Sequence, residues 1–420
     1  MRKNQKHPES EMLSLGYRPE MHLGAVKCPL FLTSTFSFKT AEEGKAFFEL
    51  AYGLRDKKPG EEMGMIYSRV DNPNLQLAEK RLAVWDDGED AAFFSSGMAA
   101  ISTMLLTFLK PGDLLLYGSP VYGGTDHFIN QVLPDFGVQV FQFTAEEGLG
   151  EIKKRLGHDY PNKYASFIFV EIPGNPTNSL IDIEMCSRLA ADLTRDGKRP
   201  ILAVDNTFLG PVFQQPLQWG ADISLYSATK FIGGHSDLLA GACVGRADLM
   251  AKIKGMRTFL GSMLDPHSCW LILRSLETLK IRMERQALSA QKVALFLKAQ
   301  SLIEKIYYLG FLEADDPQKV IFDKQCLSPG SVISFEVKGG EKSAFTFLNH
   351  LKHFKLAVSL GSTESLAEHP ASMTHVDVLA SDRQLLGITD GLVRLSIGVE
   401  EPADLIADIE QALSATDKLV

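Results

Sequence analysis

Short apolar segments recur along the middle of the chain and alternate with longer segments of helical periodicity. The short segments are apolar over most of their length, and most contain β-branched or aromatic residues, which is typical of strands buried on both faces of a sheet. Helical segments such as 98–109 and 184–196 lie between some of them. This alternation predicts an α/β domain with a mostly parallel sheet. The predicted strands are residues 114–119, 138–143, 165–173, 201–208 and 223–230.

The pattern changes near residue 265. Residues 268–300 form a long amphipathic stretch that predicts a linker helix, and alternating strands are predicted at 331–340 and 391–400. These elements indicate a smaller α+β unit. Near the other end, residues 53–64 have the Gly, Pro and charge content of a surface loop. We therefore predict an N-terminal arm at 1–66, a large domain at 67–265 and a C-terminal domain with its linker helix at 266–420.

Composition narrows the functional classes. The 420 residues carry a net charge of −9, so no broad basic surface for nucleic acid or an anionic membrane is expected. The five cysteines are scattered without a CxxC pair, which favours free thiols over a disulfide framework or a zinc site. The N-terminus shows no apolar core of a signal peptide, and no stretch of 18 apolar residues occurs. A cytoplasmic protein acting on a small polar molecule is predicted.

Polar residues follow three of the predicted strands. Asn175, Asp205 and Lys230 each come at or just after the end of an apolar run. In open α/β sheets, ligands bind outside the carboxyl ends of the strands. These three side chains are therefore expected to converge on one crevice, although Asn175 could instead make the turn of its Asn-Pro pair.

A possible phosphate site precedes the first predicted helix. Ser95, Ser96 and Gly97 stand just before the apolar stretch that ends near residue 106, and a helix N-terminus offers unpaired N–H groups to an anion. The alternative is that Ser96 only caps the helix. Neither GxxxxGK[ST] nor GxGxxG follows a strand, so the signals of nucleotide and dinucleotide binding are missing.

Lys230 stands in an unusual setting, the segment SLYSATKFIGGHSD at 224–237. Most lysines are solvated surface residues, but here Ser227 and Thr229 offer hydroxyls that suit a phosphate. An aldehyde cofactor that carries a phosphate and a pyridine ring would use all of these groups. Lys230 would form the Schiff base, and Asp205 would keep the ring nitrogen protonated, which makes the ring an electron sink.

These motifs resemble those of the Cys/Met-metabolism family of pyridoxal-phosphate enzymes, which includes cystathionine γ-synthases, cystathionine lyases and methionine γ-lyases. The resemblance runs from YSRVDNPN at 67–74 to VRLSIG at 393–398, and DISLYSATKFIGGHSDLLAG at 222–241 matches the family's cofactor-lysine motif. It implies an aspartate-aminotransferase-like (fold type I) large domain, pyridoxal 5'-phosphate as cofactor, and a homodimer at least, with a homotetramer as the family's usual assembly.

The resemblance also implies a role for each matching residue. Lys230, Tyr122 and Asp205 would be catalytic, with Tyr122 stacked on the ring and Asn175 bonded to the phenolic oxygen of the ring. Gly97, Met98, Ser227 and Thr229 would hold the phosphate, and Tyr67 and Arg69 would reach the phosphate of the partner subunit. Ser359 and Arg394 would bind the substrate's α-carboxylate. No metal is expected, and His235 is interpreted as structural.

The sequence leaves the reaction open. Val358 stands where many cystathionine enzymes of the family carry a glutamate, which favours a thioether such as methionine, whereas Gly124 replaces the cysteine that is usual in methionine γ-lyases. Cystathionine stays possible if Glu364 or water meets its distal ammonium. We predict a carbon–sulfur lyase that releases a thiol, a 2-oxo acid and ammonia from cystathionine or methionine. The alternatives are a cystathionine γ-synthase or O-acylhomoserine sulfhydrylase, and a non-catalytic protein that only binds the cofactor.

Overall fold

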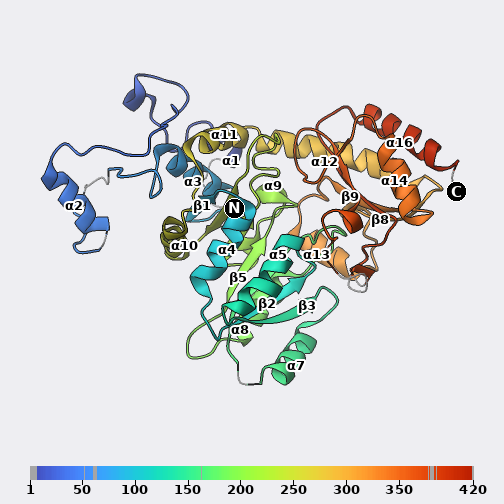
Figure 1. Cartoon of the computed structure of the whole chain (residues 1–420), viewed down its shortest axis with the longest axis horizontal. Helices are drawn as coiled ribbons and strands as arrows, with labels where there is room; N and C mark the ends of the chain where they lie inside the picture. Colours follow the sequence, from blue (N-terminus) through green and yellow to red (C-terminus); the bar gives the residue numbers. More distant parts are fainter. Residues whose placement is uncertain are drawn as a thin grey trace.

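The computed structural model describes residues 7–51, 53–59, 64–161, 163–376, 378, 383–384 and 386–418. Figure 1 shows a central domain, a second domain on the right and an N-terminal arm on the left. Part of the predicted surface loop at 53–64 lies outside the described residues, which omit 60–63. Within the described ranges, none of the helices has the length and apolar character needed to span a bilayer.

The central domain is built on a seven-stranded sheet. Only β7 runs antiparallel to its neighbours, and the other strand pairs are parallel. The expected mostly parallel sheet is therefore confirmed, and the pattern did not predict its β1 and β7 strands. In spatial order the strands are β1 (Asp90–Phe94), β7 (Gly241–Gly245), β6 (Ile223–Tyr226), β5 (Ile201–Asp205), β4 (Ala165–Glu171), β2 (Leu114–Ser119) and β3 (Gln139–Thr144).

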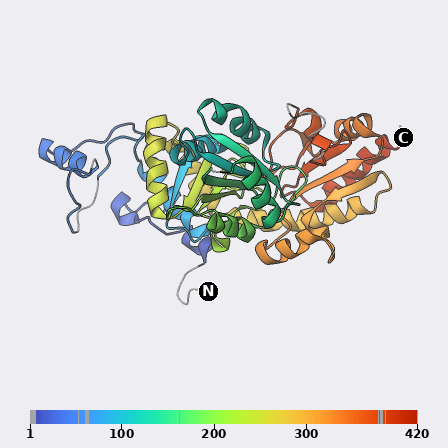
Figure 2. The same ribbon diagram turned by 90° about the horizontal axis from the view of Figure 1, so that it is seen from below.

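Helices cover both faces of this sheet (Figure 2). Neighbouring strand residues alternate between two cores, as Phe93 and Phe94 do, because successive side chains point to opposite faces. One core includes residues of α3 (Pro73–Trp85), α8 (Ile183–Asp192) and α11 (Pro266–Leu276). The other includes residues of α4 (Gly97–Phe108) and α10 (Ala247–Leu260). The minor helices are α5 (Gly123–His127), η2 (Phe128–Val132), α6 (Leu133–Asp135), α7 (Leu149–Asp159), α9 (Gly210–Phe213) and η3 (Pro216–Trp219).

The segment predicted as one linker helix at 268–300 is two helices. α11 ends at Leu276, and α12 (Leu279–Lys298) begins after Thr278, whose backbone angles (φ −117°, ψ 7°) are not helical. α11 packs against α3 in the central domain, whereas α12 packs against α16 (Pro402–Thr416) and β8 (Ile303–Tyr307) in the second domain. The amphipathic period continues across the break, so the sequence alone does not reveal it.

The second domain contains a five-stranded sheet in the order β10 (Lys355–Leu356), β11 (Leu366–Glu368), β12 (Leu392–Ser396), β9 (Val332–Val337) and β8. Its strands pair antiparallel except β10 with β11. Residues of this sheet and of α12, α14 (Gly340–His350) and α16 form its core. This is the smaller α+β unit that the sequence predicts. It also contains η4 (Leu309–Phe311) and η5 (Pro370–Ser372), whereas α13 (Pro317–Gln325) packs against the core of the central domain.

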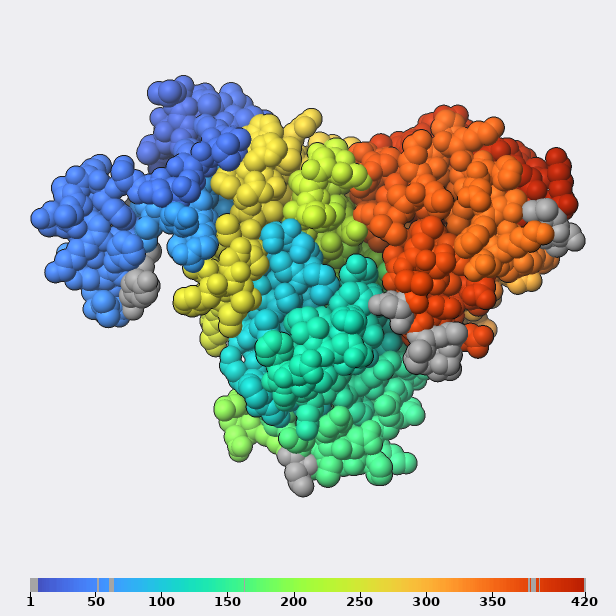
Figure 3. Space-filling view, viewed as in Figure 1, coloured from blue at the N-terminus to red at the C-terminus, as the bar shows by residue number. Residues whose placement is uncertain are grey.

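The inner part of the N-terminal arm packs on the central domain, where Met12 is buried in the core, and its outer part extends away from it. The arm contains α1 (Pro8–Glu11), η1 (Pro19–His22) and α2 (Ala41–Ala51), and Figure 3 shows its outer part as a separate lobe at the left. Several large apolar side chains on it are exposed, among them Leu23 at 105% and Leu32 at 72%.

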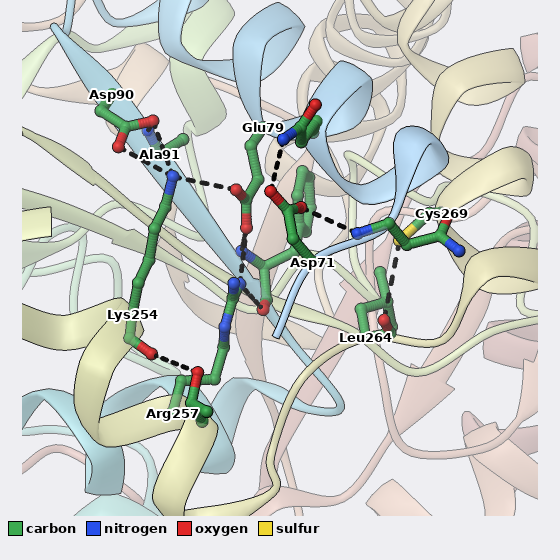
Figure 4. Close-up of polar contacts among 12 residues, drawn as sticks. Asp71, Glu79, Asp90, Ala91, Lys254, Arg257, Leu264 and Cys269 are labelled. Atoms are coloured by element: carbon green, nitrogen blue, oxygen red, sulfur yellow. Dashed lines mark hydrogen bonds and ion pairs between the residues drawn. The ribbon is translucent and has the colours of Figure 1, made fainter. Parts of the chain in front are cut away.

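A buried ionic cluster joins α3, β1 and α10 (Figure 4). Glu79 accepts hydrogen bonds from Arg257 Nη1 (2.5 Å) and from the backbone N–H of Phe93 (3.0 Å). Lys254 Nζ lies 3.0 Å from Glu79 and 2.8 Å from Asp90. The cluster fixes β1 just before the chain enters the Ser95–Ser96–Gly97 segment.

Candidate active site

The carboxyl ends of β4, β5 and β6 face a cavity of about 650 Å³, which the N-terminus of α4 and the second domain complete. The lining contains three residues that the sequence places at strand ends, together with predicted phosphate and carboxylate ligands. The predicted site residues in the lining are Gly97, Met98, Tyr122, Asn175, Asp205, Ser227, Thr229, Lys230, Val358, Ser359 and Arg394.

Two predicted residues lie elsewhere. Tyr67 and Arg69 are not part of this lining. Arg69 donates from Nη1 to the carbonyl of Thr258 (2.8 Å) and lies over the Tyr67 ring, with Cζ 5.7 Å from its centroid. Within one chain these residues are therefore separate from the cavity, and their predicted contact with a partner's cofactor stays a prediction.

The N-terminus of α4 is shaped for an anion. Ser96 caps the helix by accepting a hydrogen bond from the N–H of Ala99 (3.0 Å). Helix capping by Ser96 is therefore correct, and it is compatible with anion binding at the same helix end. A Cβ atom on Gly97 would lie 3.0 Å from both Cβ and Oγ of Ser227. The missing side chain lets the helix end approach the Ser227 segment, and the remaining helix N–H groups suit a phosphate.

Asp205 ends β5 and is 5% exposed. Its Oδ1 accepts from the backbone N–H (3.0 Å) and the hydroxyl (2.6 Å) of Thr207. Burial raises the pKa of this carboxyl, and the Thr207 bonds oppose the rise. A buried carboxylate with few cationic neighbours is suited to a cationic ring N–H, since that charge would compensate it.

Glu171 is a site residue that the sequence analysis missed. It pairs with Asp205 across β4 and β5, and its carboxyl accepts from the N–H of Tyr122 (2.7 Å) and of Asn175 (3.3 Å). Burial and the nearby Asp205 charge raise its pKa. The sequence did contain a signal for Glu171. It begins the EIPGNP segment, directly after the apolar residues of a predicted buried strand.

Lys230 lies in the turn that follows β6. Its Nζ donates to Oγ of Ser359 in the second domain (2.7 Å). Burial lowers the pKa of this lysine to about 8, the nearby Arg394 charge adds to the lowering, and Glu368 opposes it. A lysine held in this way carries a substantial neutral amine fraction near physiological pH, as a nucleophile or base requires.

Arg394 on β12 is 3% exposed and is held by three protein groups. Nη1 donates to Asn175 Oδ1 (2.9 Å) and pairs with Glu368 Oε1 (2.9 Å), and Nη2 donates to the carbonyl of Ser359 (2.8 Å). Its Nε has no hydrogen-bond partner among the described residues. The acidic partner of Arg394 is therefore Glu368. An arginine with a spare donor suits a substrate carboxylate.

The Tyr122 ring occupies the space beside Gly124. Tyr122 is 44% exposed at the cavity, and a Cβ atom at position 124 would lie 2.7 Å from its Cε1. Residue 124 therefore controls where this ring can stand. Since a flat ring at the cavity wall can cover a planar cofactor, the arrangement fits the predicted stacking.

His235 and Glu364, which the sequence analysis also considered, do not line the cavity. His235 Nδ1 contacts the carbonyl of Gly233 (2.7 Å) and the hydroxyl of Ser275 (3.3 Å), which is a structural setting. Glu364 accepts from the hydroxyl of Ser236 and is not part of the cavity lining. Over the described parts of the chain, no group of three or more His, Cys, Asp or Glu side chains is placed to hold a metal ion.

A reactive lysine after a parallel strand, an acidic residue on the neighbouring strand and a helix N-terminus for a phosphate define a pyridoxal-phosphate-dependent enzyme. The residues present fit that cofactor. The chain belongs to the family described as Cys/Met metabolism PLP-dependent enzyme, whose model matches residues 9–414. The resemblance and the cofactor predicted from the sequence are thereby confirmed.

Curated relatives carry lyase names. An L-methionine gamma-lyase of Pseudomonas deceptionensis is 38% identical, with 98% of this chain and 99% of the relative covered. An L-methionine gamma-lyase of Fusobacterium nucleatum subsp. nucleatum is 41% identical (93% and 94% covered). Human cystathionine gamma-lyase is 37% identical (98% and 94% covered). These names confirm the predicted enzyme class, a pyridoxal-phosphate-dependent carbon–sulfur lyase.

Solved structures share the fold. A cystathionine gamma synthase of Xanthomonas oryzae pv. oryzae in complex with cystathionine superposes with a TM-score of 0.87 at 32% identity, over 99% of this chain and 100% of the other. A cystathionine gamma-lyase of Lactobacillus plantarum gives 0.85 at 33% identity, over 98% and 100%. The predicted fold class is confirmed.

Proposed function

We propose that this enzyme cleaves the Cγ–S bond of methionine, which gives methanethiol, 2-oxobutyrate and ammonia. One observation carries the choice of substrate: the outer part of the cavity is apolar. Leu239, Val358 and Val376 line it and are 67%, 55% and 63% exposed. The carboxyl groups in the lining are those of Glu171 and Asp205, and both are bonded to backbone or side chains around the predicted ring site. A thioether needs no charged partner, whereas a distal ammonium would.

Each side chain in the cavity would have a distinct role in the proposed reaction. Bound pyridoxal phosphate supplies an electron sink for negative charge at the substrate carbon. Arg394 would hold the α-carboxylate through donors that the protein leaves spare, and Asp205 would hold the ring nitrogen protonated. Lys230, once its amine is released by the incoming amino acid, would take the Cα proton and then move protons at Cβ.

Thiolate departure needs a proton at sulfur. Tyr122 is the candidate acid because its ring borders the cavity and its backbone is held by Glu171. Tyr122→Phe removes the hydroxyl and keeps the ring. We expect kcat to fall by about tenfold to 100-fold, with little change in cofactor content as read from the visible absorption.

Separate incubations with methionine, with cystathionine, and with an O-activated homoserine plus cysteine test the proposal. Release of 2-oxobutyrate and methanethiol from methionine supports it, and pyruvate with homocysteine from cystathionine would indicate β-elimination instead. Val358→Glu provides the matched variant. We expect it to shift the kcat/KM ratio toward cystathionine, because it adds a carboxylate at the cavity.

A second candidate is γ-replacement, as in cystathionine γ-synthase or an O-acylhomoserine sulfhydrylase. The similarity to the solved synthase over nearly the whole chain favours it. Cystathionine formed from the homoserine ester and cysteine much faster than any deamination would identify this activity and exclude the lyase proposal.

We also propose that residues 1–66 form an arm for a partner subunit, ahead of the large domain at 67–265 and the C-terminal domain at 266–420. Its exposed apolar side chains support this, as does the position of Tyr67 and Arg69 outside their own cavity. The proposed assembly is a cytoplasmic homodimer, paired into a tetramer, which the resemblance to the family supports. Refolding inactive Arg69→Ala with inactive Lys230→Ala subunits should restore activity in hybrid dimers. No recovery from mixtures that still dimerise would exclude the shared site.

A further inference from the structure

Glu368 is a buried charge close to the cavity. It lies on β11, directly opposite Arg394 on β12 in the antiparallel register, and both side chains are almost fully buried, at 1% and 3% exposed. Its Oε1 pairs with Arg394 Nη1 (2.9 Å) and accepts from the hydroxyl of Thr374 (3.1 Å). Thr374 lines the cavity.

A continuous chain of contacts leads from Glu368 to the reactive lysine. Arg394 donates to the carbonyl of Ser359 (2.8 Å), and Lys230 donates to the Ser359 hydroxyl (2.7 Å). Ser359 has a φ of 101°, a backbone conformation that is strained in a residue with a Cβ. It is therefore held in place from both sides, by Arg394 at its backbone and by Lys230 at its side chain.

The charges around this chain act in opposite directions. Arg394 favours the neutral form of Lys230, and Glu368 favours its charged form. The charged groups near Glu368 come from three elements: Arg394 on β12, Glu171 at the end of β4, which also interacts with Arg394, and Lys230 after β6. His375, next to Thr374, contacts the Thr374 hydroxyl (3.0 Å). Glu368 is the carboxylate that balances Arg394 directly.

We propose that Glu368 is a positioning residue. It holds the Arg394 guanidinium in the orientation that receives the substrate carboxylate, and through Arg394 and Ser359 it places the Lys230 amine and partly offsets the positive charge beside it. The first half of this role rests on the proposed function, because it requires an amino-acid substrate. The second half concerns Lys230 alone and holds for any substrate.

Two variants separate the charge of Glu368 from its contacts. Glu368→Gln keeps an oxygen for Arg394 and removes the charge, whereas Glu368→Ala removes both. Glu336→Gln is the matched control, because Glu336 lies on β9 of the same sheet and bonds to the hydroxyl of Tyr307 (2.9 Å) away from the cavity.

The first measurement uses the cofactor-free enzyme, so it does not depend on the reaction. The rate at which a small amine-reactive reagent labels Lys230 is followed against pH by peptide mapping. The wild-type midpoint should lie near 8. Glu368→Gln should lower it and increase labelling at pH 7 by about threefold to tenfold, because the stabilising negative charge is gone. A wild-type midpoint in this variant, or an equal shift in Glu336→Gln, overturns the electrostatic half.

The second measurement is steady-state kinetics with the amino acid that the wild-type enzyme cleaves. Glu368→Ala should raise KM by about tenfold or more, since a buried charge-assisted contact to Arg394 is lost, and Glu368→Gln should restore most of it. An unchanged KM in Glu368→Ala overturns the positioning half, as does a KM in Glu368→Gln equal to that of Glu368→Ala. If the wild type leaves methionine intact, the proposed function fails, and the labelling result still decides the role of Glu368 at Lys230.

Discussion

Two partly buried lysines in the central domain show opposite electrostatics. Lys254 on α10 lies 3.0 Å from Glu79 and 2.8 Å from Asp90. Burial favours its neutral form, but these two carboxylates outweigh burial and raise its pKa. Lys230 donates to a neutral hydroxyl, and with Arg394 nearby its pKa falls to about 8. Similar burial thus produces a permanent cation in one place and a reactive amine in the other.

The difference lies in the partners. Lys254 belongs to a cluster in which carboxylates compensate cations and which joins α3, β1 and α10. Its charge therefore stabilises the fold. Lys230 faces a cavity, and Glu368, the carboxylate that favours its charged form, is already paired with Arg394. A lysine without its own counter-ion favours the neutral form, which is the form that attacks an aldehyde.

The largest effect is expected from replacing the reactive lysine, Lys230. Lys230→Ala should abolish covalent attachment of the cofactor and lower activity by at least about 1,000-fold. The protein should lose its visible absorption band, and borohydride should no longer fix the cofactor to the peptide that contains residue 230. A coloured, active Lys230→Ala enzyme would refute the assignment.

The next largest effect is a difference in the rates at which an amine-reactive reagent labels the two lysines. In the cofactor-free enzyme at pH 8, about half of Lys230 is neutral, and its reactivity rises as pH increases through this value. Lys254 has a raised pKa and stays charged. An amine-reactive reagent should therefore modify Lys230 on the order of 100-fold faster. Equal rates in peptide mapping would contradict the proposed electrostatic difference.

Removing the structural lysine should affect stability rather than chemistry. Lys254→Met leaves Asp90 without this cation and Glu79 with Arg257 alone. We expect a loss of about 1.5–3 kcal/mol in the free energy of unfolding, measured with denaturant, while cofactor binding is kept. A variant of normal stability that loses its cofactor would reverse the roles of the two lysines.

The smallest effect concerns the neutral partner of Lys230. Ser359→Ala removes one hydroxyl and leaves the Ser359 carbonyl that Arg394 holds. We expect a change of about threefold to tenfold in kcat/KM, equivalent to roughly 1 kcal/mol. A loss as large as that of Lys230→Ala would mean that the hydroxyl takes part in the chemistry itself.

Local patterns were enough to predict most of the central domain. β2, β4 and β6 follow from apolar runs with β-branched or aromatic residues, since strands buried on both faces lack polar positions. β1 and β7 were missed. Gly241–Gly245 is short and rich in small residues, and it is fixed by pairing with β1 and β6. The break between α11 and α12 was also missed, because the two halves pack on different domains.

The sequence by itself determined the family, the cofactor and the residues that meet at the strand ends, because each is written in contiguous motifs such as SATKFIGGHSD. Only the tertiary structure decided how those residues are paired. Glu171 beside Asp205, Glu368 beside Arg394 and the Ser359 hydroxyl on Lys230 join segments that are 26 to 129 residues apart. Such contacts depend on sheet register and on the seating of the second domain over the cavity. Burial and charge at that junction, which no local pattern records, set the protonation of Lys230.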